Sequence, residues 1–349
     1  INLNLKLEED LQIGAAIARK RRRIRLLLSQ YPLELEFGLI DNKQFLEIRK
    51  NNFQQFTRLT KREKLLWLNN FEFILTPSMR KLYSKLHRIR SYRSLGQQRC
   101  LLLGGPAGMG KTTCLNALVS NSEPEIRETQ TIVPFVLFDA PATNKSSRAL
   151  YRRLINSLGL AYLPNTSEDL LAEHAVVFLD SCQVEMIFID EIEQIVSHEI
   201  KRKILDLSNQ TRGIPIICAS CNPERWADGD PEIKGRWKDS CYLDPFNESN
   251  LGDFLTFLEI LIPFSQPSNL NEYVIVDLDN RSEPGPASFI YEKTKGILLD
   301  IMLLVRDASR KAILRDMPCI TMDLLHETWD EILTGGENLK TCSEYWVDR

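Results

Sequence analysis

The chain has 349 residues, enough for two or three domains, and it is globular in composition, with 43% hydrophobic and 26% charged residues. It shows no secretory signal and no unbroken apolar run near the ~18 residues of a membrane span, so a cytoplasmic protein without a membrane-spanning segment is expected. The net charge of −3 is unevenly spread: residues 1–100 hold 21 basic against 9 acidic residues, whereas residues 101–349 hold 23 against 38.

The excess of positive charge begins in residues 1–58, which we interpret as a basic, helical N-terminal extension. Its densest run is Arg19-Lys-Arg-Arg-Arg-Ile-Arg25. Such a run favours an anionic partner, and nucleic acid is one candidate. A solvated helix face or a contact to an acidic protein surface explains it too. Further along, residues 60–95 predict two helices separated at Thr76-Pro77.

A phosphate-binding loop follows at residues 105–112, where the sequence fits G-x-x-x-x-G-K-[ST] at every fixed position. The apolar run 100–103 predicts a buried strand before it, and a helical pattern follows. Lys111 is expected to reach the β- and γ-phosphates of ATP, and the Thr112 hydroxyl to bind Mg²⁺. The predicted ATP-binding residues are Gly105, Pro106, Ala107, Gly108, Met109, Gly110, Lys111, Thr112 and Thr113.

A second acidic element completes such a site. The segment Glu185-Met-Ile-Phe-Ile-Asp190-Glu191 reads as a doubly buried strand that ends in two carboxylates. Asp190 is expected to hold Mg²⁺, directly or through water, and Glu191 to orient and deprotonate the attacking water. The combination predicts a Mg²⁺-dependent ATPase.

Strand and helix patterns alternate between residues 99 and 245, which indicates a parallel sheet with helices on both faces. Strands are expected at 99–104, 133–139, 185–190, 214–220 and 240–244. Helices are expected at 111–120, 146–158, 167–180 and 192–212, the last ended by Gly213.

After Pro245 the sequence shows helical patterns only, which predicts a small helical lid domain. Its helices are expected at 248–262, 286–294, 297–314 and 321–333, with a loop-like stretch between the first two that holds an apolar patch at 273–278. The resulting domain boundaries are 1–58 for the extension, 59–246 for the nucleotide-binding domain, 247–334 for the lid and 335–349 for a C-terminal tail.

Eight scattered cysteines fit a reducing compartment. Cys218 and Cys221 have C-x-x-C spacing, but they follow an apolar strand and have no second pair. We therefore do not expect a zinc or redox site there.

This order of elements resembles that of AAA+ ATPases, which place two further residues at fixed points. One is a polar residue after the fourth strand (sensor 1), for which Asn222 is the first choice and Ser220 the second. The other is an arginine that reaches the neighbouring subunit's γ-phosphate in trans. Arg236 fits that position and Lys238 is a weaker candidate. A turn residue and a surface arginine are the plainer alternatives.

Within this class the chain resembles the TnsC/TniB type, the ATP-dependent regulators of Tn7-like and CRISPR-associated transposons. The resemblance is carried by segments 182–195, 211–226 and 294–313. It implies a bacterial, DNA-associated protein that uses ATP to form a ring or helical filament on double-stranded DNA. It also implies partners in a transposase and a target-selector protein.

The same resemblance implies contacts from the region after the second strand to the DNA backbone, without reading of sequence. The candidate residues are Lys145, Arg148, Arg152 and Thr166. A solvated helix start is the alternative for each.

One position departs from the family pattern, because Asp300 stands where many lids carry an arginine (sensor 2). Slow hydrolysis is the expected consequence, and the turnover of Asp300→Arg tests it. Two other functions remain open at this point: a helicase loader or initiator-like ATPase, and a nucleotide-switched signalling scaffold without a DNA role.

Overall fold

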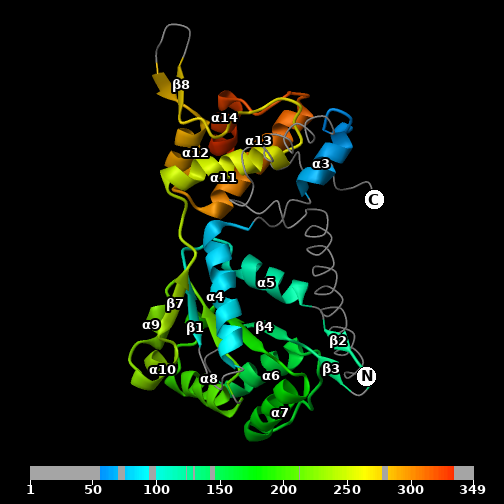
Figure 1. The fold of residues 1–349 in the computed structure, drawn as a ribbon, viewed down its shortest axis with the longest axis vertical. Coiled ribbons are helices and arrows are strands. Elements are labelled where there is room, and N and C mark those ends of the chain that lie inside the picture. The colour runs from blue at the N-terminus through cyan, green and yellow to red at the C-terminus, as the bar shows by residue number, and fades with distance from the viewer. Residues whose placement is uncertain are drawn as a thin grey trace. The chain divides into compact units, whose positions relative to one another are not determined.

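The computed structural model describes residues 56–69, 75–93, 100–122, 124–128, 130–141, 146–211, 213–276 and 282–333. They form two compact units (Figure 1), one running from Leu75 to Asp244 and the other combining residues before Leu75 with those from Pro245 onward. The basic run at 19–25 and the tail 335–349 lie outside the described residues. No described helix is both long enough and apolar enough to span a membrane.

The first unit is built on a five-stranded sheet in the order β4-β5-β6-β1-β7, and every neighbouring pair is parallel. The strands are β1 (Leu101–Gly104), β4 (Phe135–Asp139), β5 (Met186–Asp190), β6 (Ile216–Ala219) and β7 (Asp239–Tyr242). All five expected strands are therefore present. The predicted α/β class, a parallel sheet with helices on both faces, is confirmed.

Alternate residues of the central strands enter different cores, as the pleat of a strand requires. Leu102, Ile187 and Cys218 belong to one hydrophobic cluster, which also contains Leu154 and Ile204 from helices packed on that face. Because the strands are buried on both faces, their sequences read as continuous apolar runs.

The helices of this unit begin at recognisable signals. Pro77 starts α4 (Pro77–Arg93), and the side chains of Ser146 and Ser167 cap two others. The remaining helices are α5 (Lys111–Asn121), α6 (Ser147–Ser157), α7 (Glu168–Ser181), α8 (His198–Gln210), α9 (Pro223–Ala227) and α10 (Pro231–Arg236).

The predicted start of the helix at 192–212 is wrong. A short 3₁₀ turn, η2 (Ile192–Gln194), comes first, and α8 begins only at His198. Glu191 adopts a left-handed backbone with φ of 54°, and Ile195 is extended, so the chain cannot run directly from β5 into an α-helix. A small hairpin of β2 (Glu125–Ile126) and β3 (Thr131–Ile132) was not expected either.

The second unit contains α3 (Lys61–Asn69), α11 (Glu248–Leu261), α12 (Pro286–Thr294), α13 (Leu298–Leu314) and α14 (Met322–Leu333). Its four C-terminal helices follow the expected positions. The prediction of helices only is wrong, since β8 (Val274–Val276) pairs antiparallel with β9 (Ser282–Pro284), and β8 lies in the expected apolar patch.

The start of the nucleotide-binding domain at residue 59 also differs from the structure. Helix α3 packs against α13, and Lys61 forms an ion pair with Asp316 at 2.7 Å. The Trp67 indole donates to the Leu261 carbonyl at 2.8 Å. These contacts put α3 in the helical unit, a grouping that its own sequence pattern does not reveal.

Candidate nucleotide site

The phosphate-binding loop joins β1 to α5 at the carboxyl edge of the sheet. Gly110 precedes α5 with φ of 81°, in the left-handed region that glycine adopts without strain. Gly105 has φ of 136°, and a Cβ there would lie 2.5 Å from the carbonyl oxygen of Leu243. Both positions therefore require glycine, which explains two fixed points of the motif.

Lys111, the first residue of α5, turns its side chain back over this loop. Its Nζ donates to the carbonyl oxygens of Gly105 at 2.6 Å and Pro106 at 3.0 Å. The ammonium group is thus held at the concave side of a backbone that has the geometry for a phosphate, next to the positive end of the α5 dipole.

Thr112 and Asp190 meet across the site. The Thr112 hydroxyl donates to Asp190 Oδ2 at 2.5 Å, and the Asp190 side chain is buried at the end of β5. A hydroxyl beside a buried carboxylate is the oxygen donor pair that Mg²⁺ takes in P-loop proteins. The two residues predicted as metal ligands, 78 positions apart, are therefore adjacent.

Glu191 follows directly and is exposed, with its backbone N–H donating to Asp190 Oδ1 at 2.9 Å. The amide of Gln194 donates to the Glu191 carboxylate. A non-glycine residue in the left-handed region is uncommon and is often found at functional sites.

The end of β6 brings a residue to the site that the sequence did not single out for this role. Cys221 Sγ lies 3.8 Å from Lys111 Nζ, whereas Asn222 is exposed and Ser220 is buried and accepts from the Asn222 N–H at 3.2 Å. The three consecutive residues thus occupy different positions around one turn. In the sequence, only the position of Cys221 between Ser220 and Asn222, the two candidates for sensor 1, could have indicated it.

Arg236 lies at the other edge of the sheet. It ends α10, and Asp239 three residues later pairs with Leu101 at the start of β1, while the phosphate-binding loop follows the end of β1. Its Nη2 donates to Asn209 Oδ1 of α8 at 2.5 Å. The structure therefore separates Arg236 from the phosphate site of its own chain. Lys238 is exposed on the same edge.

Among the residues predicted to contact DNA, Lys145 lies outside the described residues. Arg148 is half-buried in the first turn of α6. Arg152 donates to the Pro164 carbonyl at 2.7 Å, and Thr166, which is buried, donates to the Leu163 carbonyl at 2.7 Å. Arg152 and Thr166 are thus brought to one loop, where both also serve local structure.

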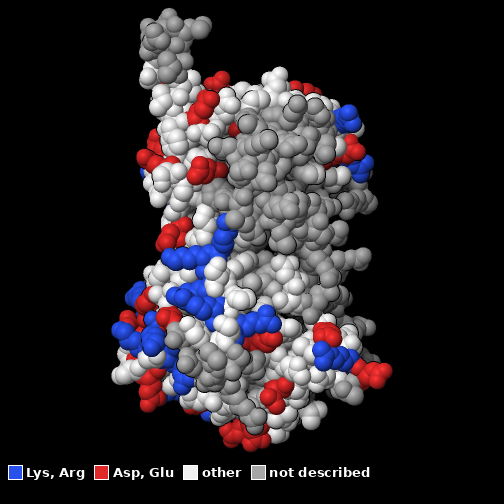
Figure 2. Space-filling view, in the orientation of Figure 1, with Lys and Arg blue, Asp and Glu red and all other residues white. Residues whose placement is uncertain are grey.

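Basic side chains gather elsewhere on this unit as well. Among the described side chains of helix α4, Arg80, Lys81, Lys85, Arg88 and Arg90 are basic and none is acidic. Figure 2 shows Lys and Arg gathered on the face where Figure 1 draws α4. This surface would attract an anionic partner.

In the helical unit, Asp300 is half-buried in the first turn of α13. A carboxylate at that place interacts favourably with the helix dipole, so it has a local structural role besides any effect on hydrolysis.

The described residues fit MgATP: a loop with glycine at two positions that require it, a lysine turned back over that loop, and a threonine–aspartate pair for the metal. A parallel sheet in the order β4-β5-β6-β1-β7, with the phosphate loop after β1 and the acidic pair after the next-but-one strand, defines an AAA+ P-loop ATPase. Comparison with protein families matches residues 64–240, just over half of the chain, to the family described as Bacterial TniB protein. The chain belongs to the TniB family, as its resemblance to the TnsC/TniB type predicts.

The match to a solved Orc1 structure supports the same fold. The Orc1 protein of Aeropyrum pernix, solved in complex with DNA, is 15% identical, with a TM-score of 0.50 over 73% of this chain and 64% of that one. Cdc6p of Pyrobaculum aerophilum is 16% identical, with a TM-score of 0.47 over 70% and 64%. The RuvB branch migration motor of Thermotoga maritima is 15% identical, with a TM-score of 0.45 over 72% and 68%.

The chain therefore spans 64% of the length of the Orc1 and Cdc6p chains, which is less than two thirds, and 68% of the length of the RuvB chain. No curated protein matches the sequence.

Proposed function

We propose that this protein is a Mg²⁺-dependent ATPase that assembles on double-stranded DNA when ATP is bound and links target-site selection to transposase recruitment in DNA transposition. The observation that carries the ATPase part is the 2.5 Å hydrogen bond between Thr112 and Asp190, which joins the two halves of the motif at one point. Membership of the TniB family supports the role in transposition.

The catalytic roles follow from the positions of the side chains. Lys111 would leave the loop carbonyls for the β- and γ-phosphates, since an ammonium group gains more from phosphate than from neutral acceptors. Thr112 and Asp190 would hold Mg²⁺, which neutralises charge on the phosphates when bound. Glu191 would take the proton of the attacking water, and Asn222 would help to orient that water.

Catalysis would need a second copy of the chain. Arg236 lies at the amino edge of the sheet, away from its own phosphate loop, so a catalytic role for it would be toward a neighbour's γ-phosphate. An arginine supplied in trans stabilises the charge that develops on the transferred group. This arrangement makes assembly and hydrolysis depend on each other.

DNA would be held through its backbone by the region of α6 and the loop near Thr166. Lys145, Arg148 and Arg152 supply the positive charge, and the basic N-terminal third adds to it. Contacts of this kind position a protein without reading sequence, as a regulator that accepts many targets requires.

Sedimentation with plain duplex DNA tests the proposal. The protein is mixed with DNA of random sequence in the presence of ADP or of a slowly hydrolysed ATP analogue, at two salt concentrations. We expect large assemblies only with the analogue, weakened by salt. Nucleotide binding with no DNA association would favour the signalling scaffold instead.

A second experiment tests which protein binds to these assemblies. Assemblies on DNA should retain a transposase in a pull-down. Retention of a replicative helicase and not of a transposase would favour the helicase loader and would contradict the role in transposition.

A further inference from the structure

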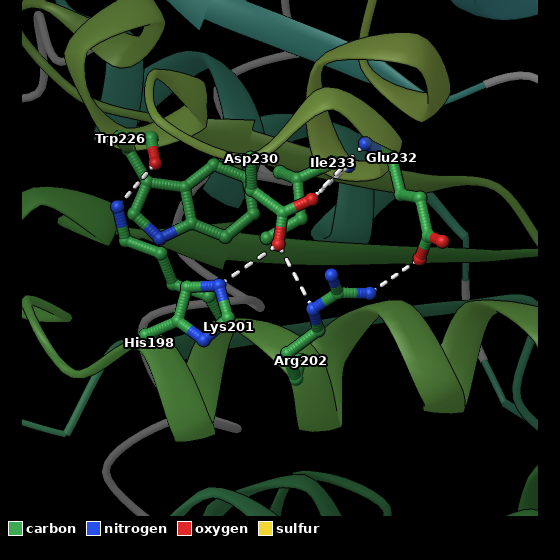
Figure 3. Close-up of polar contacts among 7 residues, drawn as sticks. All are labelled: His198, Lys201, Arg202, Trp226, Asp230, Glu232 and Ile233. Atoms are coloured by element: carbon green, nitrogen blue, oxygen red, sulfur yellow. Dashed lines mark hydrogen bonds and ion pairs between the residues drawn. The ribbon is translucent and has the colours of Figure 1, made fainter.

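A buried carboxylate joins α8 to α10 on the side of the first unit that carries Arg236. Asp230 is 4% exposed, and its Oδ2 lies 2.9 Å from Arg202 Nε and 3.0 Å from His198 Nε2 (Figure 3). Arg202 also pairs with Glu232. We name His198, Arg202, Asp230 and Glu232 the Asp230 cluster. It ties two segments that are about 30 residues apart in sequence.

The other carboxylate oxygen of Asp230 starts α10. Oδ1 accepts from the backbone N–H groups of Glu232 at 3.0 Å and Ile233 at 3.2 Å, as an N-cap does. Burial favours the neutral acid, but the two N–H groups, Arg202 and His198 outweigh it, so the pKa of Asp230 lies below its ordinary value. The carboxylate is therefore charged and fully engaged at neutral pH.

The segment before the cluster is also fixed. Lys201 donates to the carbonyl of Trp226 and lies over its ring at 5.8 Å. Trp226 packs edge-on against Trp237 with ring centroids 5.3 Å apart, and the Trp237 indole donates to the Ile216 carbonyl at 3.1 Å. Both ends of α10 are thus anchored, one by the cluster and the other by Trp237.

Arg236 lies between these anchors, one residue before Trp237, and contacts α8 through Asn209. Since α10 has only six residues, a change of its start moves its end as a rigid piece. The direction of the Arg236 side chain therefore depends on how Asp230 docks α10 on α8. An arginine that acts on a neighbour's phosphate tolerates little displacement.

We propose that the Asp230 cluster positions Arg236 for catalysis in the neighbouring subunit, with Asp230 and Arg202 as positioning residues. The proposal rests on the role of Arg236 in the proposed function. It predicts that damage to the cluster leaves the ATP site of the same chain intact and impairs the site of the next chain.

Two variants test it. Asp230→Asn keeps an N-cap side chain and removes the charge, while Arg202→Gln leaves the cap untouched. For each full-length variant we expect kcat for ATP in DNA-bound assemblies to fall about 10-fold, with ATP affinity changed less than about two-fold. Arg127→Gln, which breaks an exposed ion pair with Glu125 in the β2–β3 hairpin, is the matched control and should retain full activity.

Mixed assemblies identify which site is damaged. A Glu191→Gln subunit hydrolyses little ATP itself but carries an intact Arg236, so it should restore turnover to Asp230→Asn and to Arg202→Gln. An Arg236→Ala subunit should restore neither. Rescue by Arg236→Ala, failure of rescue by Glu191→Gln, or wild-type activity of both variants would each overturn the proposal.

The mixture of Arg236→Ala with Glu191→Gln tests the trans role of Arg236 separately from the positioning role of Asp230 and Arg202. Without rescue in that mixture, the assignment of Arg236 fails and the proposal falls with it. With rescue there but none for the cluster variants, only the role of Asp230 and Arg202 is lost. Thermal melting of Asp230→Asn and Arg202→Gln is measured first, so that failure of rescue is scored only for variants that keep their fold.

Discussion

The two edges of the parallel sheet are built in different ways. At the carboxyl edge, the phosphate loop and the Asp190–Glu191 pair are short stretches of sequence whose backbone supplies most of the geometry. At the amino edge, the Arg236 side chain donates to Asn209 of α8, and its helix α10 is capped by Asp230, whose buried carboxylate pairs with Arg202. A motif therefore identifies the first edge, whereas the second becomes visible only in the folded chain. Substitutions at each edge test this difference, because they should change ATP binding and ATP hydrolysis to different extents.

The largest effect is expected at the carboxyl edge. Lys111→Ala should abolish detectable hydrolysis and weaken ATP binding by at least about 100-fold, because a lost charge-assisted contact leaves the phosphates with backbone amides alone. Binding of a fluorescent ATP analogue and phosphate release measure this. Lys234→Ala, which alters an exposed lysine of α10, is the control and should bind ATP normally. Normal binding by Lys111→Ala would remove the nucleotide site from this loop.

At the amino edge, Arg236→Ala should reduce turnover by about 10³-fold while ATP binding is kept, the scale known for arginines supplied in trans. Single-turnover hydrolysis on DNA measures it, with Lys238→Ala as the matched variant. A larger loss in Lys238→Ala than in Arg236→Ala would transfer the role to Lys238.

Within the carboxyl edge, Glu191→Gln separates the general base from the phosphate-binding residues, since the change keeps the size of the side chain and removes its basic carboxylate. Hydrolysis should fall by about 10²-fold, and assemblies on DNA should persist after free ATP is removed. Dissociation of labelled DNA and phosphate release report the two effects. Turnover at the wild-type rate would exclude Glu191 as general base.

The smallest effect lies outside both edges and shows what an ion pair contributes where no site depends on it. In the helical unit, Arg315, and with it Lys311, lowers the pKa of Glu327 from 4.5 to about 2. A lowered pKa stabilises the fold above pH 4.5, and the gain is lost as the pH falls toward about 2. Because the Glu327 side chain is 38% exposed, we expect less than ~1 kcal/mol.

Urea unfolding of wild type and Glu327→Gln at several pH values measures this contribution. The two proteins should differ at pH 6 and converge in acid. A difference that stays constant with pH would show that the ion pair is not its source.

The same contrast explains which elements the sequence predicts. Continuous apolar runs marked the central strands β1, β5 and β6, because strands buried on both faces need them. The outer strands β4 and β7 were also predicted, although only some of their residues are buried. The two hairpins were missed since their strands have only two or three residues and side chains such as Ile126 are exposed. The helix predicted from residue 192 failed at Glu191, where the left-handed backbone overrides the helical pattern that follows.

The candidate site divides in a similar way. The glycines, Lys111, Thr112 and Asp190 were predicted from motif and spacing, and the structure brings them together. The approach of Cys221 to Lys111 and the burial of Asp230 depend on how separate strands and helices pack. No spacing rule along the sequence contains that information.

The opposite placement of the phosphate loop and Arg236 has a consequence for any row of copies. With Arg236 acting in trans as proposed, only n − 1 phosphate sites in an open row of n protomers would have an arginine from a neighbour, so one terminal protomer would keep its ATP. Turnover per protomer would then rise with the length of the row, and a closed ring would have no such slow end. The ATPase rate per protomer would thereby report the number of protomers in the row.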